Sequence, residues 1–167
     1  MMNLLGAVAG IIQLIISILF AVIALYIGFS VLDRITKGID EQKEIAKGNA
    51  AIGILIASIF IAIAIVVQSG VAGLSTGIGI ALAAGTDPLS GILAISIALI
   101  QLILGIALAV GAIYLALNIM DRMTKGINEF EELRKGNVAV ALEMAGVIIA
   151  VAVIIQAGVL GITAALI

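Results

Sequence analysis

Glu143 is the one acidic side chain that interrupts a long apolar stretch, residues 138–156. It stands about six residues, or about 9 Å, inside a predicted helix. A carboxylate in apolar surroundings is costly unless it is paired, hydrogen-bonded or protonated, so an intramembrane acid is a candidate ion or proton site, or part of an interface. At this depth the side chain also has the alternative of reaching back to the interface, or to a Lys or Arg of the preceding segment.

Four glutamines are the other polar side chains of interest inside the apolar stretches: Gln13, Gln68, Gln101 and Gln156. Each lies about 19 residues from the nearest charged segment, or about 28 Å along a helix. We therefore expect one outer polar layer, in which hydrogen bonds worth about 0.6–2 kcal/mol each join the helices. The alternative is the mouth of a polar pathway.

The composition leaves little for enzyme chemistry. Cys, His and Trp are absent, which removes disulfides, thiolate nucleophiles and the commonest metal ligand. Glu143 is the only acid that we expect to be buried, so general acid–base catalysis would lack its second carboxylate. No phosphate-binding loop, basic excess or interleaved aromatic pattern is present. We expect no enzyme, no metal or cofactor, and no nucleic-acid partner.

The elements that position these side chains are membrane helices. The chain of 167 residues is 64% hydrophobic and 11% charged, far from the soluble average of roughly 25% charged. Each long apolar stretch reaches about the 20 residues that cross a bilayer. The first is expected to stay as an anchor, since no basic residue of a cleavable signal peptide precedes it. The predicted crossings are residues 4–32, 50–68, 93–120 and 138–156.

Two polar segments, residues 33–49 and 121–137, interrupt the apolar chain and are near copies of one another. They share 11 of 17 positions at a constant offset of 88 residues. They hold every base of the chain: Arg34, Lys37, Lys43, Lys47, Arg122, Lys125, Arg134 and Lys135. The positive-inside rule therefore predicts that both are cytoplasmic loops. The termini then lie outside, and the two hairpins form tandem repeats in parallel orientation.

The predicted organisation has two membrane repeats with a connection between them. Residues 1–69 form the first two-helix repeat, residues 92–167 the second, and residues 70–91 an apolar, Gly-rich connection outside the cytoplasm. Because an even number of crossings must separate the two loops, residues 70–85 cannot be a further full span. They extend the second helix, lie at the interface or re-enter the membrane.

Small residues recur at helical spacing, and such stripes mark where membrane helices pack closely. We expect the stripes to form the inner seam of a four-helix bundle. Their members are Gln13, Ser17, Ala21, Ala24 and Gly28; Gly53, Ala57, Ala64 and Gln68; Gln101, Gly105, Ala109, Ala112 and Ala116; and Ala141, Ala145, Ala152 and Gln156.

The last helix carries a second small-residue face. Ala139, Gly146 and Ala150 share a side with Glu143, opposite the Gln156 stripe. We expect this face to lie at or near the interface of a homo-oligomer.

The polar segments are predicted to form short amphipathic structures. Gly38 and Gly126 suit left-handed helix ends. Asp40 and Asn128 are candidate caps of a following turn, and Asn49 and Asn137 of the next crossing. An apolar side is expected to lie against the membrane surface, formed by Ile39, Ile45, Ile127, Phe130 and Leu133. Ion pairs are expected at the helix exits, Asp33 with Arg34 and Asp121 with Arg122. Their expected role is an interfacial anchor with snorkelling Arg, and the alternative is a docking surface for a cytosolic partner or lipid head groups.

The repeated D-R-[IM]-T-K-G-I segment, followed by an acidic stretch and K-G-N-[AV]-[AV], resembles the domain-of-unknown-function family number three hundred and fifty, a group of YjfL-like prokaryotic inner-membrane proteins. The resemblance covers two tandem units and implies topology and location in the plasma (inner) membrane, without an activity. The motif residues are Asp33, Arg34, Thr36, Lys37, Gly48 and Asn49 with Asp121, Arg122, Thr124, Lys125, Gly136 and Asn137.

Three functions fit the sequence. The first is a structural or scaffolding homo-oligomer that contacts membrane lipids and presents its loops to a cytosolic or membrane partner. The second is an ion- or proton-conducting oligomer that uses Glu143. The third is an accessory subunit of a larger membrane complex.

Overall fold

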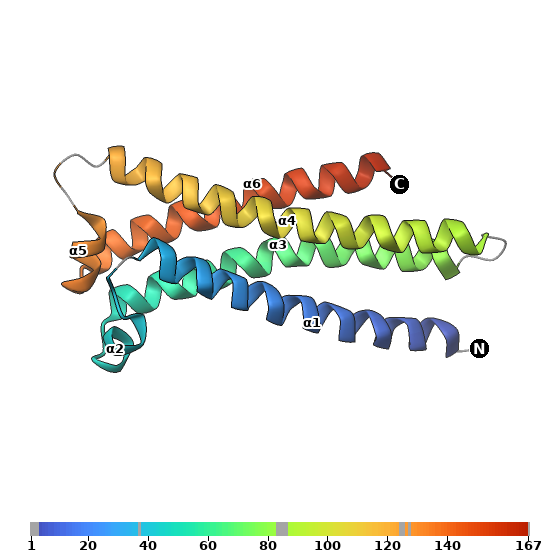
Figure 1. The fold of residues 1–167 in the computed structure, drawn as a ribbon, viewed down its shortest axis with the longest axis horizontal. Coiled ribbons are helices and arrows are strands. Elements are labelled where there is room, and N and C mark those ends of the chain that lie inside the picture. Colours follow the sequence, from blue (N-terminus) through green and yellow to red (C-terminus); the bar gives the residue numbers. More distant parts are fainter. Residues whose placement is uncertain (1–3, 37, 83–86, 124–125, 127, 167) are drawn as a thin grey trace.

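The protein is helical over the residues that this computed structural model describes, 4–36, 38–82, 87–123, 126 and 128–166, and that part of the chain contains no strand. There are four long helices and two short ones, and each short helix lies between two long ones in the chain (Figure 1). They are α1 (Leu4–Ile35), α2 (Glu41–Ala46), α3 (Ala50–Leu82), α4 (Pro88–Met123), α5 (Glu129–Arg134) and α6 (Val138–Leu166).

The four long helices are able to cross a membrane by length and composition. Their apolar spans are Gly6–Ile27, Ala50–Ile80, Leu89–Met120 and Val138–Ile162. The predicted all-α class is therefore confirmed, with four helices that are able to span a membrane.

The helix boundaries follow from side chains that cap them. Asn49 accepts hydrogen bonds from the backbone N–H of Ala51 and Ile52 at the start of α3. Asn137 does the same for Ala139 and Val140 at the start of α6. Pro88 opens α4, where its missing N–H would have no helical partner in any case.

Residues 70–82 continue α3 without a break. Of the three alternatives for the Gly-rich segment, the extension of the second helix is the one observed, while residues 83–86 lie outside the described part. With 33 residues, α3 is about 50 Å long, well beyond the roughly 30 Å of a hydrocarbon core.

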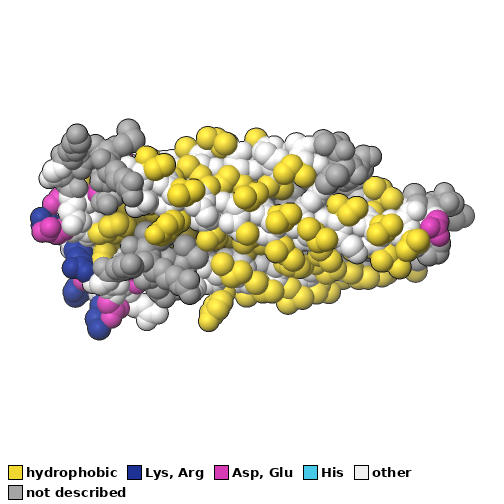
Figure 2. Space-filling view, turned by 45° about the horizontal axis from the view of Figure 1, so that its top comes forward, with side chains coloured by type: hydrophobic (Ala, Val, Ile, Leu, Met, Phe, Trp, Pro, Cys, Tyr) yellow, Lys and Arg dark blue, Asp and Glu magenta, His cyan; other side chains and the backbone are white. Residues whose placement is uncertain are grey.

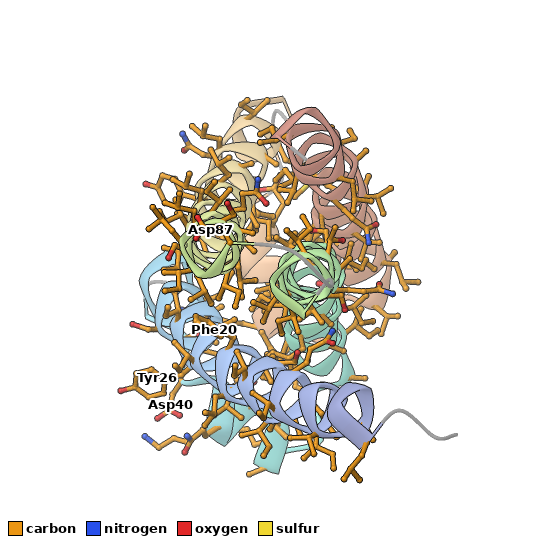
Figure 3. The ribbon with its side chains drawn as sticks, turned by 90° about the vertical axis from the view of Figure 1, so that its right-hand side faces the viewer. Phe20, Tyr26, Asp40 and Asp87 are labelled. Carbon is orange, nitrogen blue, oxygen red and sulfur yellow. The ribbon has the colours of Figure 1, made fainter. Side chains whose placement is uncertain are left out.

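Helix α3 is the centre of the packing. It contacts α4 and α6 extensively and α1 along one flank (Figures 1 and 3). In the most apolar 18-residue stretch of α3, 56% of the stretch is buried inside the protein, whereas in the corresponding stretch of α1 only 6% is buried. Packing is therefore concentrated in α3, α4 and α6, and α1 lies outside this core. The largest fully buried side chains of α3 are Ile52, Leu55, Val66 and Leu74.

The predicted small-residue stripes lie on buried faces of α4 and α6, whereas on α3 the prediction is wrong. Gln101 and Ala109 of α4 and Ala141 and Ala152 of α6 are buried. On α3, by contrast, Ala57, Ala64 and Gln68 are exposed. Because α3 packs against three other long helices, its buried faces combine large aliphatic side chains with small ones outside the predicted stripe, namely Ala51, Ser58, Ala62 and Ser69. On α1, Ala24 is fully buried and Gln13, Ser17 and Ala21 are partly buried, while the Gly28 position is outside the described side chains.

Charge is segregated along the long axis. Lys, Arg and most acidic side chains gather at the end formed by α2 and α5, and the long helices present hydrophobic side chains to the outside (Figure 2). The start of α1 and the end of α6 lie toward the opposite end (Figure 1). Asp87 precedes α4 at that opposite end (Figure 3).

Candidate functional site at the polar end

The polar end is built from two short helices with the same capping pattern. Asp40 accepts a hydrogen bond from the N–H of Lys43 at 3.1 Å and caps α2. Asn128 accepts from the N–H of Glu131 at 3.1 Å and caps α5. Both predicted caps are confirmed. Lys43 also forms an ion pair with Asp40, which lowers the pKa of Asp40 and raises the pKa of Lys43.

Each short helix joins the next long helix through a Glu-x-x-Lys-Gly-Asn sequence. In the first segment Lys47 donates to Glu44 at 2.7 Å and Asn49 donates to the same carboxylate at 3.1 Å. Gly48 makes the turn between them with φ of 82°, a left-handed conformation that glycine adopts without strain. The hydrogen bonds from Lys47 and Asn49 lower the pKa of the Glu44 carboxyl.

The second segment repeats this arrangement. Asn137 donates to Glu132 at 2.8 Å and Lys135 donates to it at 2.9 Å. These bonds lower the pKa of Glu132, and the two acids Glu132 and Glu131 raise the pKa of Lys135. Gly136 has φ of 81°. The motif residues Gly48, Asn49, Gly136 and Asn137 are therefore local structural residues that turn the chain back into the membrane helices.

The two segments also bind each other. The amide of Asn49 donates to the backbone carbonyls of Leu133 at 2.9 Å and Arg134 at 3.3 Å, at the end of α5. The guanidinium of Arg134 donates in turn to the carbonyl of Gly38. The sequence did not predict this connection, because Arg134 corresponds to Ala46 in the first segment and is therefore not part of the repeated motif.

Two acids at the polar end are buried, which corrects the expectation that the segment carboxylates are solvated and that Glu143 is the only buried acid. Glu41 is 6% exposed and Glu129 is 2% exposed. The hydroxyl of Thr36, itself buried, donates to Glu41. The sequence held one signal for this site, since a Thr and a Glu five residues apart recur in both copies, as Thr36 with Glu41 and Thr124 with Glu129.

The apolar side chains of the segments are partly integrated into the protein core. Leu133 is fully buried and Ile39 is 9% exposed, so the prediction that they lie against the membrane surface is wrong for these two. The short helices fold back onto the ends of the long helices, and their apolar sides pack there. Ile45 is exposed and Phe130 partly buried, and Ile127 is outside the described residues.

Other motif residues fall outside what the structure describes. Lys37, Thr124 and Lys125 are not described, and neither are the side chains of Asp33, Arg34, Asp121 and Arg122. The predicted ion pairs at the helix exits therefore stay predictions.

Glu143 lies on the outer face of α6, away from the packed core. Its side chain is exposed, and so are Ala139, Gly146 and Ala150 on the same face. Its counterpart in the first repeat, Leu55, is 1% exposed. The structure thus places Glu143 where a bilayer or a partner helix would meet it.

The four glutamines have different surroundings. Gln13 donates to the hydroxyl of Ser75 on α3, seven residues, or about 10 Å, beyond Gln68 along that helix. Gln101 is buried, Gln156 is partly buried and Gln68 is exposed. Gln13 therefore does join two helices by a hydrogen bond, as expected of an interhelical clasp, but at a different level from Gln68.

Gln68 belongs to a groove between α1 and α3 with a volume of about 310 Å³. Its lining is apolar except for Gln68 and Ser17, and includes Ala21, Leu25, Ala64 and Val71. A second hollow of about 290 Å³, between α3 and α4, is lined by residues that include Gly77, Ser90 and Gln101.

The arrangement offers ion pairs, helix caps and hydrogen bonds between segments. The described residues contain no group of three or more His, Cys, Asp or Glu side chains placed to hold a metal ion.

One comparison with known proteins gives a result. The family model described as Domain of Unknown Function (DUF350) matches the chain twice, over residues 6–105 and 89–167. No curated protein and no solved structure matches.

Proposed function

Since the chain belongs to the DUF350 family, present here as two tandem copies, we propose that this multi-pass membrane protein is a structural homo-oligomer rather than an enzyme. In this proposal it resides in the prokaryotic plasma membrane, with the polar end in the cytoplasm and both termini outside. The concentration of all bases in the two polar segments supports this orientation.

The exposed carboxyl of Glu143 carries the proposal. It lies about 8 Å from the start of α6, within the apolar span. A carboxyl facing acyl chains is costly, and the small residues Ala139, Gly146 and Ala150 around it allow another helix to approach closely. A protein surface that covers this face removes the carboxyl from lipid.

The connected polar segments support a scaffolding role. Asn49 and Arg134 tie α2 and α5 into one unit, which presents exposed Lys43, Lys47 and Lys135 at the same end of the molecule. Such a surface can bind membrane head groups or a cytosolic partner, and this role requires no conformational change.

A conducting path through a single copy has less support. The helices meet through aliphatic side chains such as Leu55, Leu102 and Ile148, all buried, and Glu143 points away from them. Conduction would need a ring of Glu143 side chains from several copies.

The test is the oligomeric state in lipid. Subunits are counted by photobleaching of labelled protein in native-membrane particles, for the unchanged chain, Glu143→Gln and Ala150→Leu. The proposal predicts a defined oligomer that Ala150→Leu dissociates and Glu143→Gln retains, since the neutral amide keeps its size and hydrogen-bonding capacity. A monomer in native membranes contradicts it.

Proton flux into vesicles separates the alternatives. A structural protein leaves vesicles tight in both the unchanged and the Glu143→Gln forms. Flux that Glu143→Gln abolishes would establish the conducting oligomer instead. Reproducible co-purification of one other membrane protein would establish the accessory subunit.

A further inference from the structure

The two repeats have unequal surroundings, and the difference is systematic. On α3 one face is buried throughout: Ala51, Leu55, Ser58, Ala62, Val66 and Ser69. The positions 88 residues later on α6 are all exposed: Ala139, Glu143, Gly146, Ala150, Ile154 and Ala157. The same face is thus covered in the first repeat and uncovered in the second.

The cover on α3 is the groove between α4 and α6. A Cβ at Gly105 of α4 would lie 3.2 Å from Val159 of α6 and 3.6 Å from Val66 of α3, so Val66 sits where the other two helices meet. Nearby, Gly70 packs directly against Leu102. The two repeats therefore pack together through one face of α3, which lies in the groove between α4 and α6 of the second repeat.

The corresponding groove of the first repeat is empty. Ser17 of α1 and Val71 of α3, the counterparts of Gly105 and Val159, both line the open groove of about 310 Å³. Leu14, the counterpart of Leu102, is 60% exposed. One chain thus carries an unfilled groove on α1 and α3, and an uncovered helix face on α6.

From this complementarity we infer that copies of the chain associate head to tail, with the α6 face of one copy in the α1–α3 groove of the next. The contact continues the interface that already joins the two repeats within the chain. In this contact Ile154 of one copy, 71% exposed in the single chain, packs against Ser17 of the next copy, as Val66 packs against Gly105 within the chain. Likewise Gly158 of one copy packs against Leu14 of the next, as Gly70 packs against Leu102. The inference rests on the proposed homo-oligomer and specifies its geometry.

The polar end supplies a matching contact. Asn49 donates to the carbonyls of Leu133 and Arg134 across the repeat boundary. By the same relation Asn137 of one copy would donate to the carbonyls of Ile45 and Ala46 in the next. Glu143, which replaces Leu55, would then lie inside the contact and near the end that carries the neighbour's Lys side chains, where a carboxyl has partners.

A head-to-tail contact uses two different surfaces, so it propagates into a ring or a row of subunits. A symmetric contact of α6 with α6 would stop at a dimer. This difference makes the geometry testable in a chain that has no native Cys.

The experiment is disulfide cross-linking in native membranes, with Ile154→Cys and Ser17→Cys placed on separately tagged copies. The expected result is a dimer band that requires both cysteines, because only close Cα positions, within about 7 Å, can be bridged. A chain with both substitutions is expected to give a ladder beyond the dimer. The matched control replaces Ser17→Cys by Leu19→Cys, which is equally within α1 but about 200° around the helix and 58% exposed.

A second variant tests the contact without cysteines. Nothing lies within 4 Å of a Cβ at Gly158 or at Gly111, so Leu at either position is compatible with the folded chain. Gly158→Leu is expected to shift the protein to monomers, because it occupies the space for Leu14 of the neighbour. Gly111→Leu, on an exposed face of α4, is expected to leave the subunit number unchanged.

Three outcomes would overturn the inference. Cross-links of Ile154→Cys with itself alone would retain the homo-oligomer and replace head-to-tail by symmetric contact. Suppose that the protein is oligomeric, that Ile154→Cys cross-links neither with Ser17→Cys nor with itself, and that Gly158→Leu leaves the oligomer intact. The groove would then be filled by lipid acyl chains rather than by a second copy. A monomer in every preparation would remove both the geometry and the proposed function.

Discussion

The two asparagines that precede α3 and α6 differ in one interaction. Both cap the following helix, and only Asn49 also reaches the carbonyls at the end of α5. The loss of a cap costs about 1 kcal/mol, and a further hydrogen bond contributes about 0.5–1.5 kcal/mol. We expect Asn49→Ala to lower the free energy of unfolding by about 1 kcal/mol more than Asn137→Ala.

Reversible unfolding of the monomer in detergent, followed by circular dichroism, measures this difference. Equal losses for the two variants would mean that the bond between the polar segments adds nothing to stability.

Glu44 and Glu132 make the stability of the polar end depend on pH. Their folded-state pKa values lie below the ordinary value of 4.5, so the folded state binds protons less readily than the unfolded one. Their contribution is therefore complete above the ordinary pKa and is lost as the pH falls through the lowered one. We expect hydrogen exchange of α2 and α5 amides to speed up in that window, relative to intrinsic rates.

Glu44→Gln provides the control for the acid response. It should reduce the pH dependence of protection in α2, where the cap Asp40 keeps its own lowered pKa, and leave that in α5, where Glu132 is unchanged. Loss of protection that begins near neutral pH would point to other groups.

At the scale of elements, the hairpin of α3 and α4 depends on a close approach of the two helices. A Cβ at Gly77 would lie 3.0 Å from the carbonyl oxygen of Ala94, a backbone atom that cannot move aside, whereas nothing lies within 4 Å of a Cβ at Gly79. We expect Gly77→Leu to destabilise the protein by about 1–3 kcal/mol or more through overpacking. Gly79→Leu, two residues further and about 200° around the helix, should change little.

The midpoint of thermal unfolding in lipid particles tests this pair. A similar loss for both variants would show that helix propensity, rather than contact with α4, sets the effect.

The elements themselves were largely predictable. Apolar stretches and the positions of Asn49 and Asn137 locate the four long helices and the starts of α3 and α6, because composition and caps are local properties. The ends of α3 and α6, at Leu82 and Leu166, lie well beyond the predicted ends at residues 68 and 156. The face that α3 buries was not predictable. The small stripe of Ala57 and Ala64 suits close packing, but α3 has neighbours on three sides, and the side it shares with α1 remains partly open.

At the scale of the whole molecule, orientation in the membrane is the next test. In the proposed orientation, with the bases in the cytoplasm, the start of α4 and the preceding Asp87 would face the outside. We expect an impermeant maleimide to label Asp87→Cys in intact cells and to label Lys43→Cys only after the membrane is opened.

Labelling of Lys43→Cys from outside would reverse the orientation. The cysteine-free background makes every signal attributable to the introduced residue.

The burial of Glu41 and Glu129 could not be predicted from their positions in the sequence. Glu41 and Glu129 belong to charged stretches, and solvent exposure is the usual fate of such side chains. They are buried because the short helices fold back onto the ends of the long ones, α2 onto α3 and α5 onto both α6 and α3. Glu143 is the opposite case, since its neighbours are apolar and yet the folded chain leaves it on the outside.

The sequence by itself determined the membrane class, the duplication, the four spans and the caps, since these depend on composition, repetition and short-range hydrogen bonding. Only the tertiary structure decided which face of each helix is buried, that Asn49 joins the two polar segments, and that an empty groove on α1 and α3 has the complementary α6 face at the other end of the same chain. Both repeats have nearly the same local pattern, so the pattern alone does not show which helix face is covered: contacts with α4 and α6 bury that face on α3, while the matching face of α6 is exposed.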